Sequence, residues 1–362
     1  MLGTKLKRCG ETPRVVSHST SFSFRNLSVI PDCTWSGRPI STPAIRGAII
    51  SWCIGITPVF ASEPLPALNQ SPLAALRALP AQRSAEVEEG FSWHIVGSVS
   101  NHFTMQDSGS ESLFLDGQSN VMSIGLRYRI ADSWDAELSI PWRHHTGGFT
   151  DNLITEWHTL FGLPNADRDR HPINDLRYNL SLPGHHRQLH QPASGIGDVQ
   201  IALNRQWLKL DGGQLSAGVG VKLPTGEADK WLGSGATDVY TVLRYSGQQL
   251  NGWPLYWHGQ IGATYAGSSE LLNETQKRSL WFAGLAAEWR FSPRWSALFQ
   301  YDVHSALLSA DLDALSRPAG VVSMALRWRS SKGWWIDVGF SEDAVVEASP
   351  DITFLLSARY SM

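Results

Sequence analysis

Three segments between residues 194 and 246 decide the fold: SGIGDVQIALNRQW (194–207), LSAGVGVKLPTG (215–226) and SGATDVYTVLRYS (234–246). Apolar and polar residues alternate in each of them, which is the two-residue period of a β-strand with one apolar and one polar face. In the last segment, Val239 and Leu243 fall on one face, and Asp238 and Arg244 fall on the other. A soluble sandwich buries such an apolar face against a second sheet, whereas a transmembrane barrel exposes it to lipid.

The composition favours the membrane barrel. Only 17% of the 362 residues are charged, and the chain contains 16 Trp and 32 Gly. Tryptophan concentrates at membrane interfaces, where one end of the ring meets water and the other meets lipid. The length accommodates either two soluble domains or one barrel with a leader, so the remaining pattern must decide.

The front of the chain indicates export. Residues 46–61 combine Arg46, an apolar run and the small-residue pattern Val59-Phe60-Ala61, which together predict a signal peptide cleaved after Ala61. The run is too short to span a membrane as a helix. Residues 1–45 are interpreted as upstream sequence translated from a start codon assigned too early, with an organellar transit peptide as the alternative.

Cleavage after Ala61 changes the composition of the exported chain. All three cysteines precede the cut, so neither a disulfide nor a thiol nucleophile is expected. The exported chain keeps 23 basic and 31 acidic residues, a net charge of about −8. This acidic balance argues against nucleic acid as a partner.

Residues 62–90 are expected to form a periplasmic N-terminal segment ahead of the barrel. A short helical pattern begins at Ser71, with Pro72 at its first position, and ends at Pro80. The favoured interpretation is a leader that ties down the N-terminus. The alternative is a helix that plugs or docks on the periplasmic mouth.

Twelve segments of residues 91–362 carry the strand pattern, at 92–103, 121–130, 134–143, 198–204, 215–223, 238–246, 254–265, 279–291, 295–304, 321–329, 334–341 and 352–360. Their connections alternate between short ones, such as 131–133 and 330–333, and long ones, such as 144–193. An even strand number with short turns on one side and long loops on the other is typical of outer-membrane barrels. The predicted fold is therefore all-β: a single antiparallel transmembrane barrel of about 12 strands, with one short amphipathic helix in a long external loop, in the bacterial outer membrane.

The aromatic residues and the C-terminal strand indicate which partners to expect. Tryptophans lie beside the short turns, where an interfacial girdle belongs: Trp134, Trp207, Trp253, Trp295 and Trp334. Phe354, Leu356, Ala358 and Tyr360 share one face of the last strand, as in the C-terminal assembly signal of such barrels. We therefore expect contacts with outer-membrane lipid and lipopolysaccharide, and with the barrel-assembly machinery.

The long loop 144–193 contains the expected helix at residues 150–162, which begins near Asp151 and ends at Gly162. Its apolar stripe must be buried somewhere, so the helix is predicted to fold into the lumen as a plug, to cover the mouth as a lid, or to bind a partner. The candidate residues are Asp151, Ile154, Trp157, His158 and Phe161.

The same loop carries a family resemblance. The string GGFTDNLITEWHTLFGLP (147–164), with NQSP at 69–72, resembles a family of Gram-negative outer-membrane proteins known as domain of unknown function 3187. The segments SGIGDV and KLPTG also resemble the outer-membrane barrels named for meta-pathway phenol degradation. The resemblance implies location and fold, and it supplies no activity and no site residues.

Four lumen-facing residues are the candidates for a constriction: Asp198, Lys222, Asp238 and Arg244. Asp198 and Asp238 occupy equivalent places in two SGxxDV elements, and Lys222 lies on the strand between them. The alternative is a buried charge network that merely fills a narrow barrel.

The sequence carries no catalytic, metal or cofactor signature. Seven His lie from His144 to His190, but no two of them have the i, i+4 spacing of metal ligands within a predicted helix. The GxSxG motif of serine hydrolases is absent from the sequence. We therefore predict no enzyme, no metal and no cofactor; an outer-membrane lipid hydrolase is a weaker alternative. The expected function is a narrow channel or uptake pore for a small-molecule solute, gated by the 144–193 loop. The alternative is a closed structural or adhesion barrel that acts through its external loops.

Overall fold

The computed structural model describes residues 62–362, apart from 163–167, 211, 250–251, 273–274 and 345–348, within one compact unit, Pro58–Met362. The proposed upstream extension 1–45 and signal peptide 46–61 lie outside the described residues. No helix among the described residues has the length and apolar character needed to cross a membrane.

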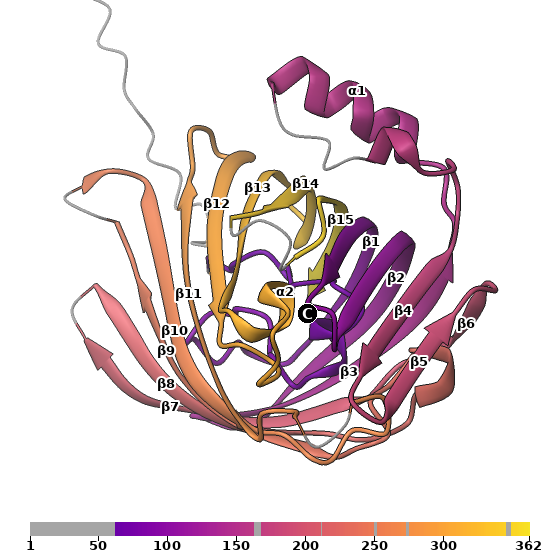
Figure 1. Ribbon diagram of the computed structural model, residues 1–362. Helices are drawn as coiled ribbons and strands as arrows, with labels where there is room; N and C mark the ends of the chain where they lie inside the picture. Colours follow the sequence, from indigo (N-terminus) through magenta and orange to yellow (C-terminus); the bar gives the residue numbers. More distant parts are fainter. Residues whose placement is uncertain (1–61, 163–167, 211, 250–251, 273–274, 345–348) are drawn as a thin grey trace, which may run out of the picture. The chain divides into compact units, whose positions relative to one another are not determined.

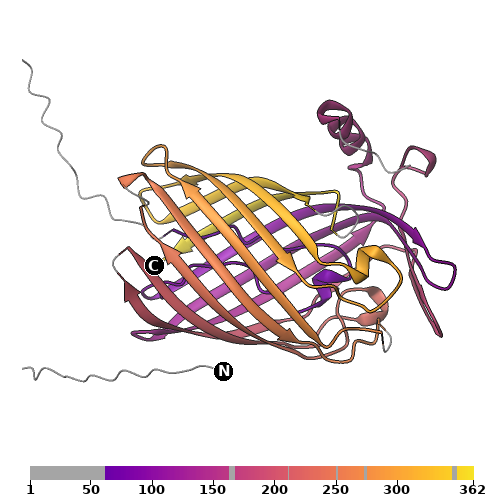
Figure 2. The same ribbon diagram turned by 60° about the vertical axis from the view of Figure 1, so that its left-hand side comes forward.

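Twelve antiparallel strands close into a barrel (Figures 1 and 2). They are β1 (Phe91–Asp107), β2 (Ser112–Ala131), β3 (Trp134–Thr146), β7 (Gln200–Leu210), β8 (Gly213–Lys222), β9 (Asp238–Gly247), β10 (Leu255–Tyr265), β11 (Ser279–Trp289), β12 (Trp295–His304), β13 (Ala319–Arg329), β14 (Trp334–Asp343) and β15 (Ile352–Ser361). The first strand pairs with the last, from Ser92↔Ser361 to Asn101↔Ile352, so the barrel has no open seam. The predicted fold is confirmed.

The two faces of each strand have the predicted polarity. On β9, Leu243 is 46% exposed on the outer wall, whereas Asp238 and Arg244 are buried on the inner wall. Outward apolar residues recur on every other position of β2 and β3, including Met122, Ile124 and Trp142. The outer wall therefore suits lipid, and the polar side chains are directed into the lumen.

Aromatic side chains mark the end of the barrel with short turns. At the closure between β1 and β14–β15, the rings of Trp93 and Trp334 meet edge to face with centroids 5.3 Å apart, and Tyr360 packs against both. Trp207, Trp253 and Trp289 are exposed near the same end. These residues form the interfacial girdle that the sequence predicts.

The external side contains strands that the sequence does not predict. β1 and β2 continue outward to a tight hairpin at 108–111, where a long loop is expected. The loop 144–193 contains three further strands: β4 (Arg177–Leu182), β5 (His185–Leu189) and β6 (Ala193–Ile196). β4 pairs with β2 beyond the end of β3, and β6 pairs with β3 beyond the end of β7. Both strands thus satisfy backbone groups that an exposed edge would leave unpaired.

Short helices complete the external side: α1 (Asp151–Phe161), η2 (Arg168–Arg170), η3 (Ala228–Lys230) and α2 (Asp313–Ser316), together with η1 (Ala74–Leu76) near the N-terminus. Figures 1 and 2 show α1 beyond the end of the barrel wall, away from the lumen. The predicted helix therefore exists, with nearly the predicted bounds.

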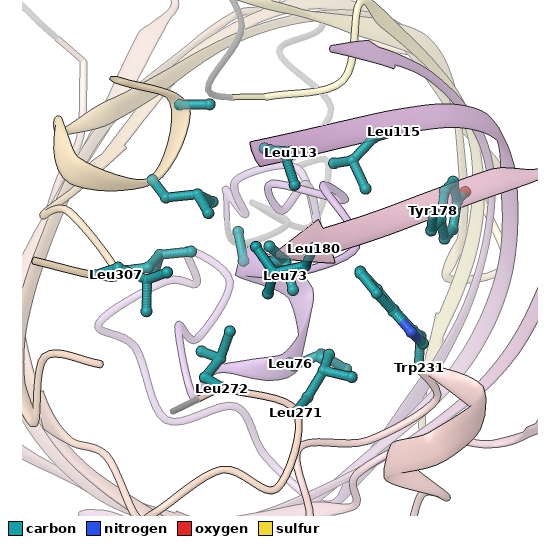
Figure 3. Close-up of a cluster of buried hydrophobic side chains, with 14 of the residues drawn as sticks. Leu73, Leu76, Leu113, Leu115, Tyr178, Leu180, Trp231, Leu271, Leu272 and Leu307 are labelled. Carbon is teal, nitrogen blue, oxygen red and sulfur yellow. The ribbon is translucent and has the colours of Figure 1, made fainter. Parts of the chain in front are cut away.

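The largest buried apolar cluster closes the external mouth (Figure 3). We call it the apolar cap, and its labelled members are Leu73, Leu76, Leu113, Leu115, Tyr178, Leu180, Trp231, Leu271, Leu272 and Leu307. These residues come from η1, the β1–β2 hairpin, β4 and three external loops. Residues far apart in the sequence thus meet in one cover over the lumen.

The lipid-facing assignment of the outer wall predicts a depth-dependent cost. Leu243→Arg, near the middle of β9, should lower the free energy of unfolding by about 2–4 kcal/mol, whereas Val239→Arg, near the external end, should cost only about 0–1 kcal/mol. Urea unfolding of the two variants in lipid vesicles, followed by loss of heat-modifiable migration, measures the difference. Equal costs at both depths would contradict the assignment.

Candidate functional site in the barrel lumen

The N-terminal residues 62–90, here called the lumen segment, run inside the barrel. The segment starts at the periplasmic end, where Ser62 Oγ donates to Glu288 Oε2 at 2.8 Å. It rises past Gln300, whose side chain accepts from Leu65 N at 2.9 Å, to the external end, where Asn69 meets His304. We expected this segment on the periplasmic side, and the structure places it in the lumen instead.

The segment then turns at η1 and returns. Ala78 N donates to Asp238 Oδ2 at 3.0 Å near the external end. Lower down, Ser84 Oγ lies 3.3 Å from Ser246 Oγ, and Ser84 N donates to Glu63 Oε2 at 3.1 Å. The two arms therefore contact each other as well as the wall. Prolines at 64, 66, 72 and 80 keep the segment from pairing as a strand, because proline cannot donate to a sheet ladder.

Ionic contacts fix the periplasmic half of the segment. Glu63 accepts from Arg127 at 2.5 Å and from Arg359 at 3.0 Å, and its carbonyl oxygen accepts from Arg327 at 2.6 Å. Arg359 also contacts Glu88 of the segment. One carboxylate thus bridges strands on both sides of the barrel closure.

Arg83 of the lumen segment carries the opposite charge and contacts two acidic residues of the wall. Its guanidinium forms a two-pronged contact with Asp135, at 2.8 and 2.6 Å, and reaches Glu137 at 3.0 Å. All three side chains are largely buried. A charge-assisted fork of this kind is strong and directional, so it sets the height of the segment in the lumen.

Three of the four constriction candidates lie together. Lys222 Nζ is 2.6 Å from Asp198 Oδ2 and 3.8 Å from Asp238 Oδ2, and it also donates to Ser234 Oγ and the Ala236 carbonyl. Lys222 is only 1% exposed. The 223–237 loop and the lumen segment cover the cluster, and Asp238 accepts from Ala78 of the segment. We call this group the lysine cluster.

The fourth candidate, Arg244, lies elsewhere. It follows Asp238 by six residues on β9, so it occupies the lumen nearer the periplasmic end and donates to Asn204 Oδ1 at 2.8 Å. Sequence alternation places both residues on the lumen face but does not separate them by depth. The lysine cluster and Arg244 are therefore two distinct sites.

Two of the loop-helix candidates, Asp151 and Ile154, attach the first turn of α1 to the external rim. Asp151 Oδ1 accepts from Asn101 at 2.7 Å and from Arg168 at 3.1 Å, and its Oδ2 accepts from Asn174 N at 2.6 Å. Ile154 is fully buried, whereas Leu153 and Leu160 are exposed. The side chains of Trp157, His158 and Phe161 lie outside the described residues. The lumen position predicted for this helix as a plug is occupied by residues 62–90.

Histidines at the external end belong to a closed network. Ser119 Oγ lies 2.9 Å from His102 Nε2 and 2.8 Å from His145 Nδ1, and His145 Nε2 donates to the Trp231 carbonyl at 3.1 Å. Ser119 is buried, and Tyr178 packs against both imidazoles. Across the part of the chain that the structure describes, no group of three or more His, Cys, Asp or Glu is placed to hold a metal ion.

Sequence reasoning missed the lumen segment as the filling of the barrel. Its partners lie about 50 to 300 residues further along the chain, for example Arg83 with Asp135 and Glu88 with Arg359. Two signals were available. The segment is rich in proline, and the predicted lumen wall carries charges of both signs, with which Glu63 and Arg83 of the segment can pair. Neither signal has a period that a strand or helix search detects.

These features define the class of protein. A closed antiparallel barrel with an apolar outer wall, an aromatic girdle and a polar lumen is a bacterial outer-membrane β-barrel. The chain belongs to the family described as protein of unknown function (DUF3187), whose model matches residues 57–362. The family predicted from residues 147–164 is confirmed.

The chain is similar to solved structures of other outer-membrane proteins. The COG4313 outer membrane channel from Pseudomonas putida F1 matches with a TM-score of 0.50 and 14% identity, over 76% of this chain and 96% of that chain. The NanC porin matches with a TM-score of 0.42 and 8% identity, over 75% and 100% of the two chains. The toluene transporter TodX from P. putida matches with a TM-score of 0.39 and 10% identity, over 80% and 94%. No curated protein sequence is significantly similar to this chain.

A substitution in the lysine cluster tests whether the cluster stabilises the barrel or selects ions. Lys222→Met leaves Asp198 buried without its ammonium partner, whereas Asp238 keeps Arg77 at 3.8 Å, so the substitution should lower the free energy of unfolding by about 3–5 kcal/mol. Lys230→Met is the matched control, because Lys230 pairs at 2.8 Å with Glu227 in a largely exposed contact worth about 0–1 kcal/mol.

Reversal potential is measured in a planar bilayer on the same Lys222→Met substitution in a protein without residues 62–86, because little current is expected while the lumen segment fills the barrel. A shift toward cations would assign the lysine cluster to ion selection. An unchanged reversal potential together with a lowered unfolding temperature would assign it to packing. A Lys222→Met variant as stable as the wild type would contradict the burial of an ion pair at this position.

Proposed function

We propose that this protein is a channel for small solutes across the outer membrane, closed at rest by the lumen segment. The observation that carries the proposal is that residues 62–90 are attached to the wall by hydrogen bonds, ion pairs and the apolar cap, and not by strand pairing. Such contacts can be broken and remade without opening the barrel. Displacement of the segment leaves a lumen lined by polar and charged side chains, which suits the passage of water-soluble molecules.

Several wall side chains opposite the segment are small, which supports this interpretation. Ser98, Ser123 and Ser139 line a residual cavity of about 80 Å³ between the wall and the segment. A barrel selected only for stability can fill its interior with its own large side chains, as small barrels do. Here the wall leaves room that a separate piece of chain fills.

The apolar cap sets the resting state. Burial of Leu73 and Leu76 contributes about 1.5–3 kcal/mol for each side chain. Because about 1.4 kcal/mol corresponds to a factor of ten, these two leucines alone favour the closed form by a factor of about 100 or more. We therefore expect little conductance from the intact protein at rest.

The loop 144–193 acts in this proposal as an external lid. Arg168 joins α1 to the end of the loop before β15 through Asp151 and Asp351, so the base of the helix is tied to the rim at the barrel closure. Signal-peptide cleavage after Ala61, which we also propose, leaves Ser62 at the periplasmic end of the lumen, where a periplasmic factor can reach the segment. The second candidate function is a closed barrel that acts through external surfaces, and the exposed hairpin of β4 and β5 favours it.

A disulfide between the segment and the wall tests the proposal. The Ser84 and Ser246 hydroxyl oxygens are 3.3 Å apart, so cysteines at these positions are placed to form a bond. The oxidised Ser84→Cys/Ser246→Cys variant should show no conductance, the reduced form should return to the wild-type level, and deletion of residues 62–86 should give large, stable channels in planar bilayers.

Two controls complete this experiment. Ser84→Cys alone should behave as the wild type under oxidising and reducing conditions, and deletion of residues 151–162 should raise the opening frequency of the reduced protein without enlarging its conductance. A correctly assembled deletion of 62–86 that does not conduct would overturn the channel and favour the closed barrel.

A further inference from the structure

The residual cavity in the lumen has the features of a binding site. It lies between Pro66 and Pro80 of the lumen segment and the wall formed by β1, β2, β3, β7 and β9. Its volume of about 80 Å³ is roughly half that of a cavity of about 150 Å³ that holds benzene, so it suits a molecule of roughly three to five heavy atoms.

Arg244 provides an unmatched positive charge at this cavity. The side chain is 3% exposed and lines the cavity, yet no carboxylate among the described residues forms an ion pair with it. Its Nε has no hydrogen-bond acceptor among those residues, and its one recorded bond is Nη1 to Asn204 Oδ1. By contrast, Arg83 and Arg127 each contact two carboxylates.

The position of Arg244 is fixed by its neighbours. Asn204 donates from its amide nitrogen to Asp135 at 2.9 Å, which turns Asn204 Oδ1 toward the guanidinium. Gly218 on β8 leaves the space for both groups, because a Cβ there would lie 2.3 Å from Asn204 Oδ1 and 3.1 Å from Arg244 Nη1. A buried guanidinium held in one orientation is preorganised for a ligand.

The other polar groups of the cavity can donate hydrogen bonds, and most of them can also accept one. Tyr240, His94, two glutamines and three serines line it, and the one carboxylate among the lining residues, Glu137, already accepts from Arg83 and lies 3.6 Å from Arg127. The unpaired guanidinium favours an anionic occupant over a cation, and the neighbouring donors can bind the oxygens of that occupant. A carboxylate also matches the planar fork of arginine.

We propose that Arg244 and the surrounding donors form a binding site for a small monocarboxylate, of the size of formate or acetate. The binding site itself is inferred from the cavity alone. The further step, that such acids are the solutes of the channel, rests on the proposed function. Arg244 belongs to the wall, so it also lies beside the path of a solute when the segment is displaced. It therefore gives the channel a preference for small organic acids over neutral solutes of equal size.

The test uses the full-length exported protein in detergent, with sodium formate and sodium acetate as probes and sodium chloride at the same ionic strength as the reference. Binding is measured by titration calorimetry and by the rise in unfolding temperature after long equilibration. The wild type should show saturable binding of at least one acid and no equal effect of chloride. Arg244→Gln should weaken binding by at least about tenfold, since a charge-assisted contact is lost.

Control variants separate the site from folding and from bulk charge. Arg205→Gln removes one positive charge from the outer face of β7, where Arg205 stacks on Trp134, and should leave binding unchanged. Tyr240→Phe keeps the ring and removes one donor, so it should weaken binding in an intact barrel even if Arg244→Gln fails to assemble. Absence of saturable binding to the wild type, equal binding of chloride, or unchanged binding by both Arg244→Gln and Tyr240→Phe would overturn the proposal.

Conductance of the same samples distinguishes failure of the site from failure of the channel. Saturable acid binding without conductance in the deletion of 62–86 supports the site and overturns the channel. Conductance in that deletion, without acid binding to the wild type, supports the channel and overturns the site.

Discussion

Buried charges are costly unless they are paired, and this constraint determines most of the interior of the protein. The wall contributes Arg127, Arg327 and Arg359 on β2, β13 and β15, and Asp135 and Glu137 on β3. Removal of one member of a buried pair typically costs about 3–5 kcal/mol, because it leaves an uncompensated charge. The lumen segment carries Glu63 toward the first group and Arg83 toward the second. The wall and the segment are therefore electrostatically complementary, and neither is complete without the other.

In the function that we propose, this complementarity allows one barrel to be closed at rest and to open. Ion pairs and hydrogen bonds between side chains can exchange with water and ions when the segment moves, whereas the strand ladder stays intact. The apolar cap opposes that exchange, because Leu73 and Leu76 lose their burial when the segment leaves. The closed state is thus held by two kinds of interaction at opposite ends of the lumen. Arg244 stands apart from both, since the segment passes it without providing a carboxylate.

Local patterns in the sequence predict most of the barrel. Alternation along β9 separates Leu243 from Arg244 correctly, because the faces of a strand depend only on neighbouring positions. The contact of Lys222 with Asp198 and Asp238 is also predictable, since the three residues lie at the external ends of consecutive strands. The family can be predicted for a similar reason, because the motif at 147–164 is one continuous stretch of sequence.

Features that depend on distant contacts are beyond this reasoning. Glu63 meets Arg359 across almost the whole chain, and no short-range period predicts that pair. The helix α1 has the amphipathic stripe of a plug, but Asp151 ties its first turn to Arg168 and Asn101 at the external rim. The hairpin of β1 and β2 extends past the end of β3 because β4 continues the pairing, and the partners run from Ser112↔Ser181 to Asp116↔Arg177, far apart in sequence. Topology, and not propensity, decides these three cases.

The central claim is that residues 62–90 are folded inside the lumen. Hydrogen exchange of the assembled barrel, followed by mass spectrometry of peptides from this segment, tests it most directly. The account predicts that amides of Leu65, Ala78, Ser84 and Ala85, which donate to lumen side chains, exchange as slowly as those of the barrel strands and become fast when Glu63 and Arg83 are replaced together by Gln. Complete exchange of the segment within seconds in the intact wild-type barrel would contradict it.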